Sequence, residues 1–273
     1  MADVDDRLPD GVRPRWLEGL GRFGNASRGI LFLVMAGLVL GVARGGGGQD
    51  AGATGALQEV AEAPLGTVAL LVVALGFAAY AVIRAVHVVV VDDEAEGLAL
   101  VGRRLVFATH AVAYGLLAVY AVMIALGIGG ASSGGSGQTT SRVLSWPAGT
   151  WLVGAVGVGV LATGVALAVA GGRREFAGVL RDDLTDRVRR PLVVLGAVGH
   201  VLRGVAFALV GWFLLVTAVT HDPDQGGGLD QALREVAEEP FGTAVLIGIA
   251  VGFAAYGLFF VAVLWAGRTR EPE

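Results

Sequence analysis

The phrase Ala63-Pro64-Leu65-Gly66-Thr67 stands at the head of a long apolar segment and recurs twice further along the chain. The later copies are Trp146-Pro147-Ala148-Gly149-Thr150 and Glu239-Pro240-Phe241-Gly242-Thr243. Proline is favoured in the first turn of a helix, because its fixed φ matches helix geometry and its missing N–H would have no partner there. The proline and glycine of each copy therefore form a structural helix-start motif: Pro64, Gly66, Pro147, Gly149, Pro240 and Gly242.

The composition of the chain indicates a membrane protein. Of 273 residues, 55% are hydrophobic and 16% are charged, and the mean hydropathy is +0.69. A helix needs about 20 consecutive apolar residues to cross about 30 Å of hydrocarbon. Six segments meet this requirement, near residues 24–43, 66–91, 105–128, 149–170, 193–219 and 242–266. Buried strands are much shorter, so the sequence predicts an all-α polytopic membrane protein with six transmembrane helices.

The repeated phrases divide these helices into pairs. Residues 57–62 recur in altered form as residues 233–238, and residues 76–80 recur as residues 252–256. We expect three tandem two-helix repeats in a pseudo-threefold arrangement. The expected boundaries are a cytoplasmic N-terminal tail (1–19), repeat 1 (20–91), repeat 2 (98–172), a cytoplasmic arginine-rich connection (173–190) and repeat 3 (191–268).

The arginines predict the orientation, because basic residues remain preferentially on the cytoplasmic side. Fourteen arginines fall in the tails and in the connections on one side, and only Arg44, Arg142 and Arg234 fall on the other. We therefore expect a multi-pass protein of the plasma membrane with both termini in the cytoplasm. Its charges lie mainly in tails and loops and do not indicate nucleic-acid binding. The lipid bilayer is the expected partner, anionic lipids are candidate ligands, and no protein partner is indicated.

The residues that the chain lacks exclude several kinds of chemistry. It has no cysteine and no lysine, which excludes a thiolate nucleophile, a Walker-type phosphate loop and a lysine Schiff base. Its four histidines do not follow a metal-binding spacing, and no carboxylate lies within the predicted helices. We expect no catalytic residues, no metal site, no cofactor and no enzymatic activity.

Ionisable residues at membrane depth are costly and often functional. Arg28 and Arg203 occupy equivalent positions in the first and third repeats, and His110 is their counterpart in the second. In one interpretation they form a ring around the pseudo-threefold axis that attracts an anionic head group or solute. In the other, each side chain extends to the cytoplasmic interface while its stem packs against neighbouring helices. The sequence leaves both open.

Tyr80 and Tyr256 form a second repeated pair, and Thr163 stands at their position in the middle repeat. The two tyrosines either line a polar crevice or bond backbone carbonyls inside a packed bundle.

The entry phrases of repeats 1 and 3, residues 24–32 (GNASRGILF) and 199–207 (GHVLRGVAF), identify a resemblance. Together with the Pro-x-Gly phrases they resemble the bacterial membrane family called domain of unknown function 1206, over roughly residues 16–268. The resemblance implies a six-helix membrane protein and brings no established activity, cofactor or catalytic residue.

Two functions from different classes remain open at this point. The chain is either a structural or accessory membrane component that presents its arginine-rich connection to a partner or to anionic lipid, or a small passive transporter or channel. In the second case the path, or a pocket for an anionic lipid, would lie near the pseudo-threefold axis.

Overall fold

The computed structural model describes residues 15–45, 51–90, 98–128, 148–220 and 228–266. This part of the chain contains helices that are long and apolar enough to cross a membrane. They are α1 (Arg15–Ala43), α3 (Gly66–Val90), α4 (Leu98–Ala125), α6 (Gly149–Gly172), α7 (Asp186–Thr220) and α9 (Gly242–Ala266). Six such helices lie in the predicted segments, which confirms the all-α fold and a multi-pass membrane protein.

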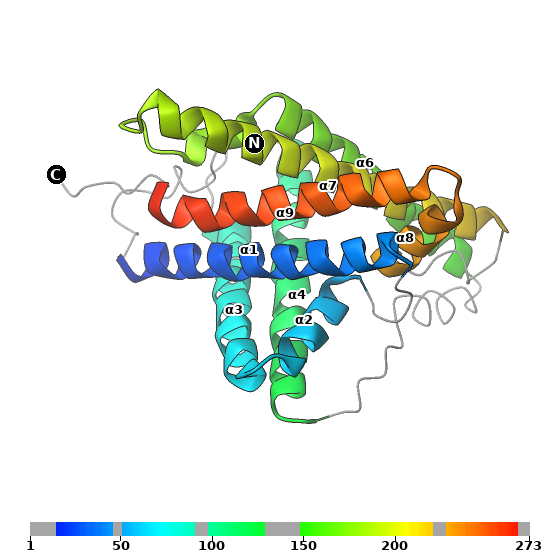
Figure 1. Cartoon of the computed structure of the whole chain (residues 1–273), viewed down its shortest axis with the longest axis horizontal. Helices are drawn as coiled ribbons and strands as arrows, with labels where there is room; N and C mark the ends of the chain where they lie inside the picture. Colours follow the sequence, from blue (N-terminus) through cyan, green and yellow to red (C-terminus); the bar gives the residue numbers. More distant parts are fainter. Residues whose placement is uncertain (1–14, 46–50, 91–97, 129–147, 221–227, 267–273) are drawn as a thin grey trace.

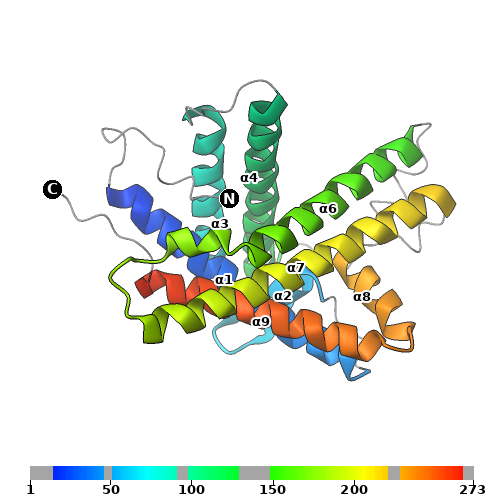
Figure 2. The same ribbon diagram turned by 90° about the horizontal axis from the view of Figure 1, so that it is seen from above.

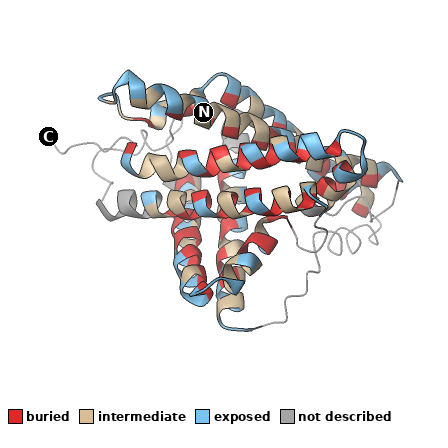
Figure 3. Cartoon of the chain, viewed as in Figure 1, coloured by how far each residue is buried: buried red, intermediate tan, exposed pale blue. Residues whose placement is uncertain are grey.

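The outward faces of these helices carry the apolar side chains that a bilayer would cover. Trp151, Val158, Leu116 and Trp212 are all exposed in the isolated chain. Figure 3 shows that exposed and buried residues alternate along most helices, so that each helix has a buried side and an open side. An apolar open side is stable in lipid and would be costly in water.

The long helices form three antiparallel pairs: α3 with α4, α6 with α7, and α9 with α1 (Figures 1 and 2). In each pair, the second helix of one repeat packs on the first helix of the next repeat, and the third repeat returns to the first. In both views the pair α3–α4 runs across α1 and α9. The interface between repeats is therefore made three times, in a cyclic order.

The two helices of a single repeat also pack together in repeats 1 and 3, where α1 contacts α3 and α7 contacts α9. Extensive contact between α4 and α6 is missing over the parts of the middle repeat that the structure describes. The cyclic order of the pairs is compatible with a pseudo-threefold arrangement. That arrangement stays a prediction, because the middle repeat is open where the other two are closed.

The second helix of each repeat begins at the glycine of the helix-start motif, not at its proline. α3 and α9 begin at Gly66 and Gly242, two residues after Pro64 and Pro240. The backbone N–H of Gly66 donates to Ala63 O over 2.8 Å, which closes a turn that contains the proline. Proline is favoured at the second position of such a turn, so it precedes the helix instead of forming its first turn.

Glycine is required in this turn because the backbone before it comes very close. A Cβ on Gly66 would lie 2.3 Å from Ala61 O, and one on Gly242 would lie 1.8 Å from Val236 O. α6 likewise begins at Gly149, whereas Pro147 lies outside the described residues.

Short amphipathic helices precede two of these turns. They are α2 (Ala53–Glu62) and α8 (Gly228–Glu238), and they have Leu57 and Leu233 buried at equivalent positions. Glu62 and Glu238 are exposed at their ends. Each helix therefore packs its apolar face against the bundle and keeps its final carboxylate at the surface.

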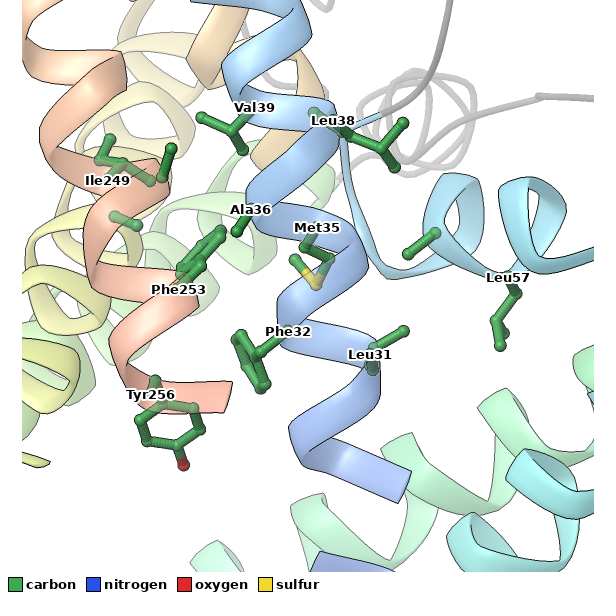
Figure 4. Close-up of a cluster of buried hydrophobic side chains, with 14 of the residues drawn as sticks. Leu31, Phe32, Met35, Ala36, Leu38, Val39, Leu57, Ile249, Phe253 and Tyr256 are labelled. Atoms are coloured by element: carbon green, nitrogen blue, oxygen red, sulfur yellow. The ribbon is translucent and has the colours of Figure 1, made fainter. Parts of the chain in front are cut away.

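The largest apolar core lies between α1 and α9. Figure 4 shows Phe32, Ala36 and Val39 of α1 facing Ile249 and Phe253 of α9, with Leu57 of α2 on the other side of α1. Phe32 and Phe253 meet edge to face, with ring centroids 5.4 Å apart. This core fixes the register of the helices that carry the buried polar side chains.

The arginine-rich connection is packed against the bundle along part of its length. It contains the short helix η2 (Glu175–Val179), and α7 begins at Asp186, inside the segment expected to be a connection. Phe176 and Leu180 are buried, and the N–H of Arg181 donates to Ala266 O at the end of α9 over 3.0 Å. The anchored part of the connection therefore holds a fixed position on the bundle.

Candidate arginine–tyrosine site

Arg28 of α1 lies at the meeting point of the three repeats. Its side chain is buried, with 5% exposed. Its Nε donates to the Tyr114 hydroxyl over 3.0 Å, and its Nη2 donates to the Tyr256 hydroxyl over 2.8 Å. The guanidinium carbon also lies 4.5 Å from the centre of the Tyr80 ring. Since these tyrosines belong to α3, α4 and α9, Arg28 contacts one tyrosine from each repeat.

Arg203 of α7 shares one of these partners. It is 6% exposed, and its Nη1 donates to the Tyr256 hydroxyl over 2.9 Å. Its guanidinium carbon lies 5.1 Å from the centre of the Phe32 ring and 4.9 Å from that of Phe207. Two buried guanidinium groups therefore converge on a single phenolic oxygen.

Arg84 of α3 lies at the margin of this cluster. Its guanidinium carbon is 4.8 Å from the centre of the Tyr80 ring, whose other neighbour is Arg28, and 5.6 Å from the centre of the Phe107 ring. Arg84 is half-buried, whereas Arg28 and Arg203 are buried. The cluster thus has two inner cations and one outer cation.

No carboxylate offsets these charges in the described part of the chain. The ion pairs found there lie in the connection between α6 and α7 and in the first turn of α7, and none of them involves Arg28, Arg84 or Arg203. Apart from Asp186 at the start of α7, the six spans contain no Asp or Glu. Burying an ionised group costs several kcal/mol, and a cation–π contact offsets only about 0.5–2 kcal/mol. The cluster therefore holds positive charge that phenol and ring contacts offset only in part.

Glycines bring the helices close enough for these contacts. A Cβ on Gly29 would lie 2.9 Å from Gly257 O, and a Cβ on Gly257 would lie 2.7 Å from Gly29 O. These glycines directly follow Arg28 and Tyr256 in the sequence. On the other side of α9, a Cβ on Gly199 would lie 2.5 Å from the backbone nitrogen of Tyr256. Close packing of both α1 and α7 on α9 thus places the two arginines on the same tyrosine.

Two histidines lie beside the cluster without contacting its arginines through hydrogen bonds. His200 stacks on Phe176, with centroids 4.7 Å apart, and meets the edge of Tyr256 at 4.9 Å. His110 is nearly parallel to Tyr114 at 6.4 Å. The Nδ1 atom of His110 is 2.7 Å from Val106 O, and since a carbonyl oxygen only accepts, we assign the ring proton to Nδ1.

The structure places four of the five candidate side chains together: Arg28, Arg203, Tyr80 and Tyr256. The two arginines point into the bundle, and the Tyr256 hydroxyl accepts from both. His110 reaches the cluster only through Tyr114, so the three equivalent positions do not form a ring of equal members. The sequence analysis missed Tyr114. Its signal was present, because Tyr114 stands where repeats 1 and 3 have Phe32 and Phe207.

Metal binding has no evident place in the described residues, where no group of three or more His, Asp or Glu side chains converges. The donors in the cluster are guanidinium N–H groups and phenol hydroxyls. The guanidinium groups attract anions and repel cations.

The comparisons with known proteins agree with the repeat organisation. The profile of the family described as Domain of Unknown Function (DUF1206) matches residues 23–90, 105–174 and 198–266. Uncharacterized protein YxxB of Bacillus subtilis (strain 168) is 30% identical over 268 residues, which cover 94% of this chain and 95% of that protein. No solved structure matches the chain. The three matched ranges confirm both the resemblance and the three repeats.

Proposed function

Because this chain belongs to the family of domain of unknown function 1206, which brings no activity with it, we propose a function from the site itself. The protein acts as a structural or accessory component of the bacterial plasma membrane, with both termini in the cytoplasm. The observation that carries this proposal is the position of Arg28, which contacts a tyrosine from each repeat. Such a contact holds three repeats in one fixed arrangement.

The arginine-rich connection supports an accessory role, because it offers a fixed polar surface. Phe176 and Leu180 anchor it, and Gly196 makes room for the Phe176 ring, since a Cβ there would lie 2.3 Å from that ring. The side chains of Arg173 and Arg190 are 73% and 82% exposed. A surface held in place loses little conformational freedom when a partner binds to it.

A small passive transporter or channel is the weaker proposal. A solute that moves along the centre of the bundle would have to break the contacts of Arg28 with Tyr114 and Tyr256 in every cycle. A proton or sodium relay would also require carboxylates within the spans, and beyond Asp186 the spans contain none.

The cysteine-free chain permits a direct test of the orientation. Asp183→Cys should react with a membrane-impermeant maleimide only after the cytoplasmic side is opened, and Ser133→Cys should react in intact cells. The reverse pattern would contradict the proposed orientation.

The role itself is tested by crosslinking and by flux. A photo-crosslinking residue in place of Arg190 should give one defined protein adduct in growing cells, whereas the same residue in place of lipid-facing Val158 should give none. Purified protein in liposomes should pass no more chloride or phosphate than empty liposomes. A flux that Arg28→Gln abolishes would instead support the transporter.

A further inference from the structure

We propose that Arg28 and Arg203 form a buried binding site for a phosphate group, with the Tyr256 hydroxyl between them. The phosphate is carried either by an anionic phospholipid or by a free phosphate ion, and the recognising chemistry is the same for both. This inference goes beyond the accessory role, which requires no ligand.

The first argument is charge. Two guanidinium groups bond the same Tyr256 oxygen, and Arg84 adds a third cation beyond the Tyr80 ring. Neither Arg28 nor Arg203 contacts a carboxylate in the part of the chain that the structure describes. Like charges that converge in a poorly solvated place repel one another, and a bound anion removes that repulsion.

The second argument is the number of unused donors. A guanidinium group carries five N–H bonds in a planar fork. Arg28 uses its Nε and Nη2, and Arg203 uses its Nη1. The Nε of Arg203 is buried and has no hydrogen-bond partner in the described structure. Buried donors are normally satisfied, so an orphan Nε beside a second guanidinium indicates an acceptor that the chain does not itself supply.

The third argument is the position of the Tyr256 hydroxyl. Figure 4 shows its oxygen pointing away from the apolar core around Phe253. This oxygen accepts from both arginines, and the hydroxyl keeps one hydrogen that it can donate. A phosphate oxygen near this place would accept from both arginines and from Tyr256. Tetrahedral phosphate, with its several acceptor oxygens, suits two guanidinium forks that approach from different helices.

A third arginine, Arg84, lies at the margin of the site. Arg84 is half-buried and contacts the same Tyr80 ring as Arg28, so its charge can attract an anion toward Arg28. In the predicted orientation α1 and α7 begin on the cytoplasmic side, at Arg15 and Asp186, so Arg28 and Arg203 lie more than three turns from those helix ends.

The test uses the whole chain in nanodiscs of neutral phosphatidylcholine, with thermal unfolding as the readout. One arm adds inorganic phosphate, and the other replaces part of the lipid with phosphatidylglycerol. We expect one arm to raise the midpoint by at least about 2 °C, because a ligand that binds only the folded state stabilises it. A rise only with phosphatidylglycerol identifies a lipid head group, and a rise with inorganic phosphate identifies a soluble anion.

The variants decide whether the effect belongs to this site. Arg28→Gln with Arg203→Gln should abolish the shift, whereas Arg44→Gln, at the exposed arginine that directly follows α1, should keep it. If wild type shows no shift in either arm, or if the double variant shifts equally, the proposal is overturned.

A second variant serves if the double variant does not fold. Tyr256→Phe keeps the ring and both cations but removes the shared oxygen. It should have a lower midpoint than wild type without anion, and the effective anion should still raise its midpoint, because both arginines remain. A Tyr256→Phe variant whose loss no anion recovers would mean that the hydroxyl is only a structural partner, and the proposal would fail.

Discussion

Repeats 1 and 3 each keep their two helices in contact, whereas the helices of the middle repeat lie apart. Two positions in each repeat account for the difference. Gly24 and Gly199 allow close approach to Tyr80 and Tyr256, and the middle repeat has Val106 and Thr163 instead. The Thr163 hydroxyl donates to Gly159 O within its own helix over 2.7 Å. Loss of a glycine and of its tyrosine partner thus removes the contact inside the repeat.

The middle repeat keeps the close contact between its second helix, α6, and α7, the first helix of repeat 3. A Cβ on Gly164 would lie 2.7 Å from Gly204 O, and one on Gly204 would lie 2.6 Å from Gly164 O. These glycines are the counterparts of Gly257 and Gly29, which make the same reciprocal contact between α9 and α1. The middle repeat has therefore kept the residues that join it to repeat 3 and lost those that would join its own helices.

The largest expected effect is an all-or-none difference in crosslinking. A Cβ on Gly115 would lie 4.0 Å from the Ala81 Cβ, within the range of about 3.5–4.5 Å that a disulfide spans. Ala81→Cys with Gly115→Cys should therefore form a disulfide on mild oxidation, seen as a mobility shift on a non-reducing gel. Val106→Cys with Thr163→Cys should form none. A crosslink in the second pair would show that the middle repeat is closed.

The interface between repeats gives the next largest effect. Gly164→Val places a side chain against the backbone of Ala208, since even a Cβ would lie 2.4 Å from its nitrogen. We expect the free energy of unfolding, measured in mixed micelles, to fall by about 3 kcal/mol. Gly159→Val is the matched control on the same helix, because no heavy atom lies within 4 Å of a Cβ there. Equal losses in both variants would mean that α6 does not pack on α7 as described.

The sequence predicted the helices well, because hydrophobic runs and repeated phrases are local signals. It also identified Arg28 and Arg203 as candidate functional residues, because charged residues are rare in transmembrane segments. It could not predict that both bond Tyr256, since that depends on the rotation of three helices about their axes. It also missed Tyr114, because an aromatic residue among apolar residues looks like ordinary core until its partner is known.

The arginine–tyrosine cluster should have a smaller effect on stability than the backbone contact. Tyr256→Phe removes the oxygen that accepts from Arg28 and Arg203, and we expect a loss of about 2 kcal/mol in neutral lipid, as is typical of hydrogen bonds to charged groups. Tyr120→Phe is the control, because its hydroxyl accepts only from neutral Gln58, over 3.0 Å, and its loss should cost about 1 kcal/mol. A loss at Tyr256 no larger than that at Tyr120 would contradict the special role of the cluster.

The smallest expected effect on stability is at Gly159 of the middle repeat, which is compared with Gly252, the equivalent glycine of repeat 3. Gly252→Ala should destabilise the protein, because its Cβ would lie 2.2 Å from the Cβ of Leu202. Gly159→Ala, at the same position of the middle repeat, should stabilise it by about 0.5–1 kcal/mol, because alanine restricts the unfolded chain and meets no atom within 4 Å. Stability changes of opposite sign at the two positions would show that the middle repeat has kept this glycine after losing the contact that requires it. The same sign at both would mean that Gly159 packs against a surface in the membrane, such as the α4 helix of its own repeat or a second copy of the chain.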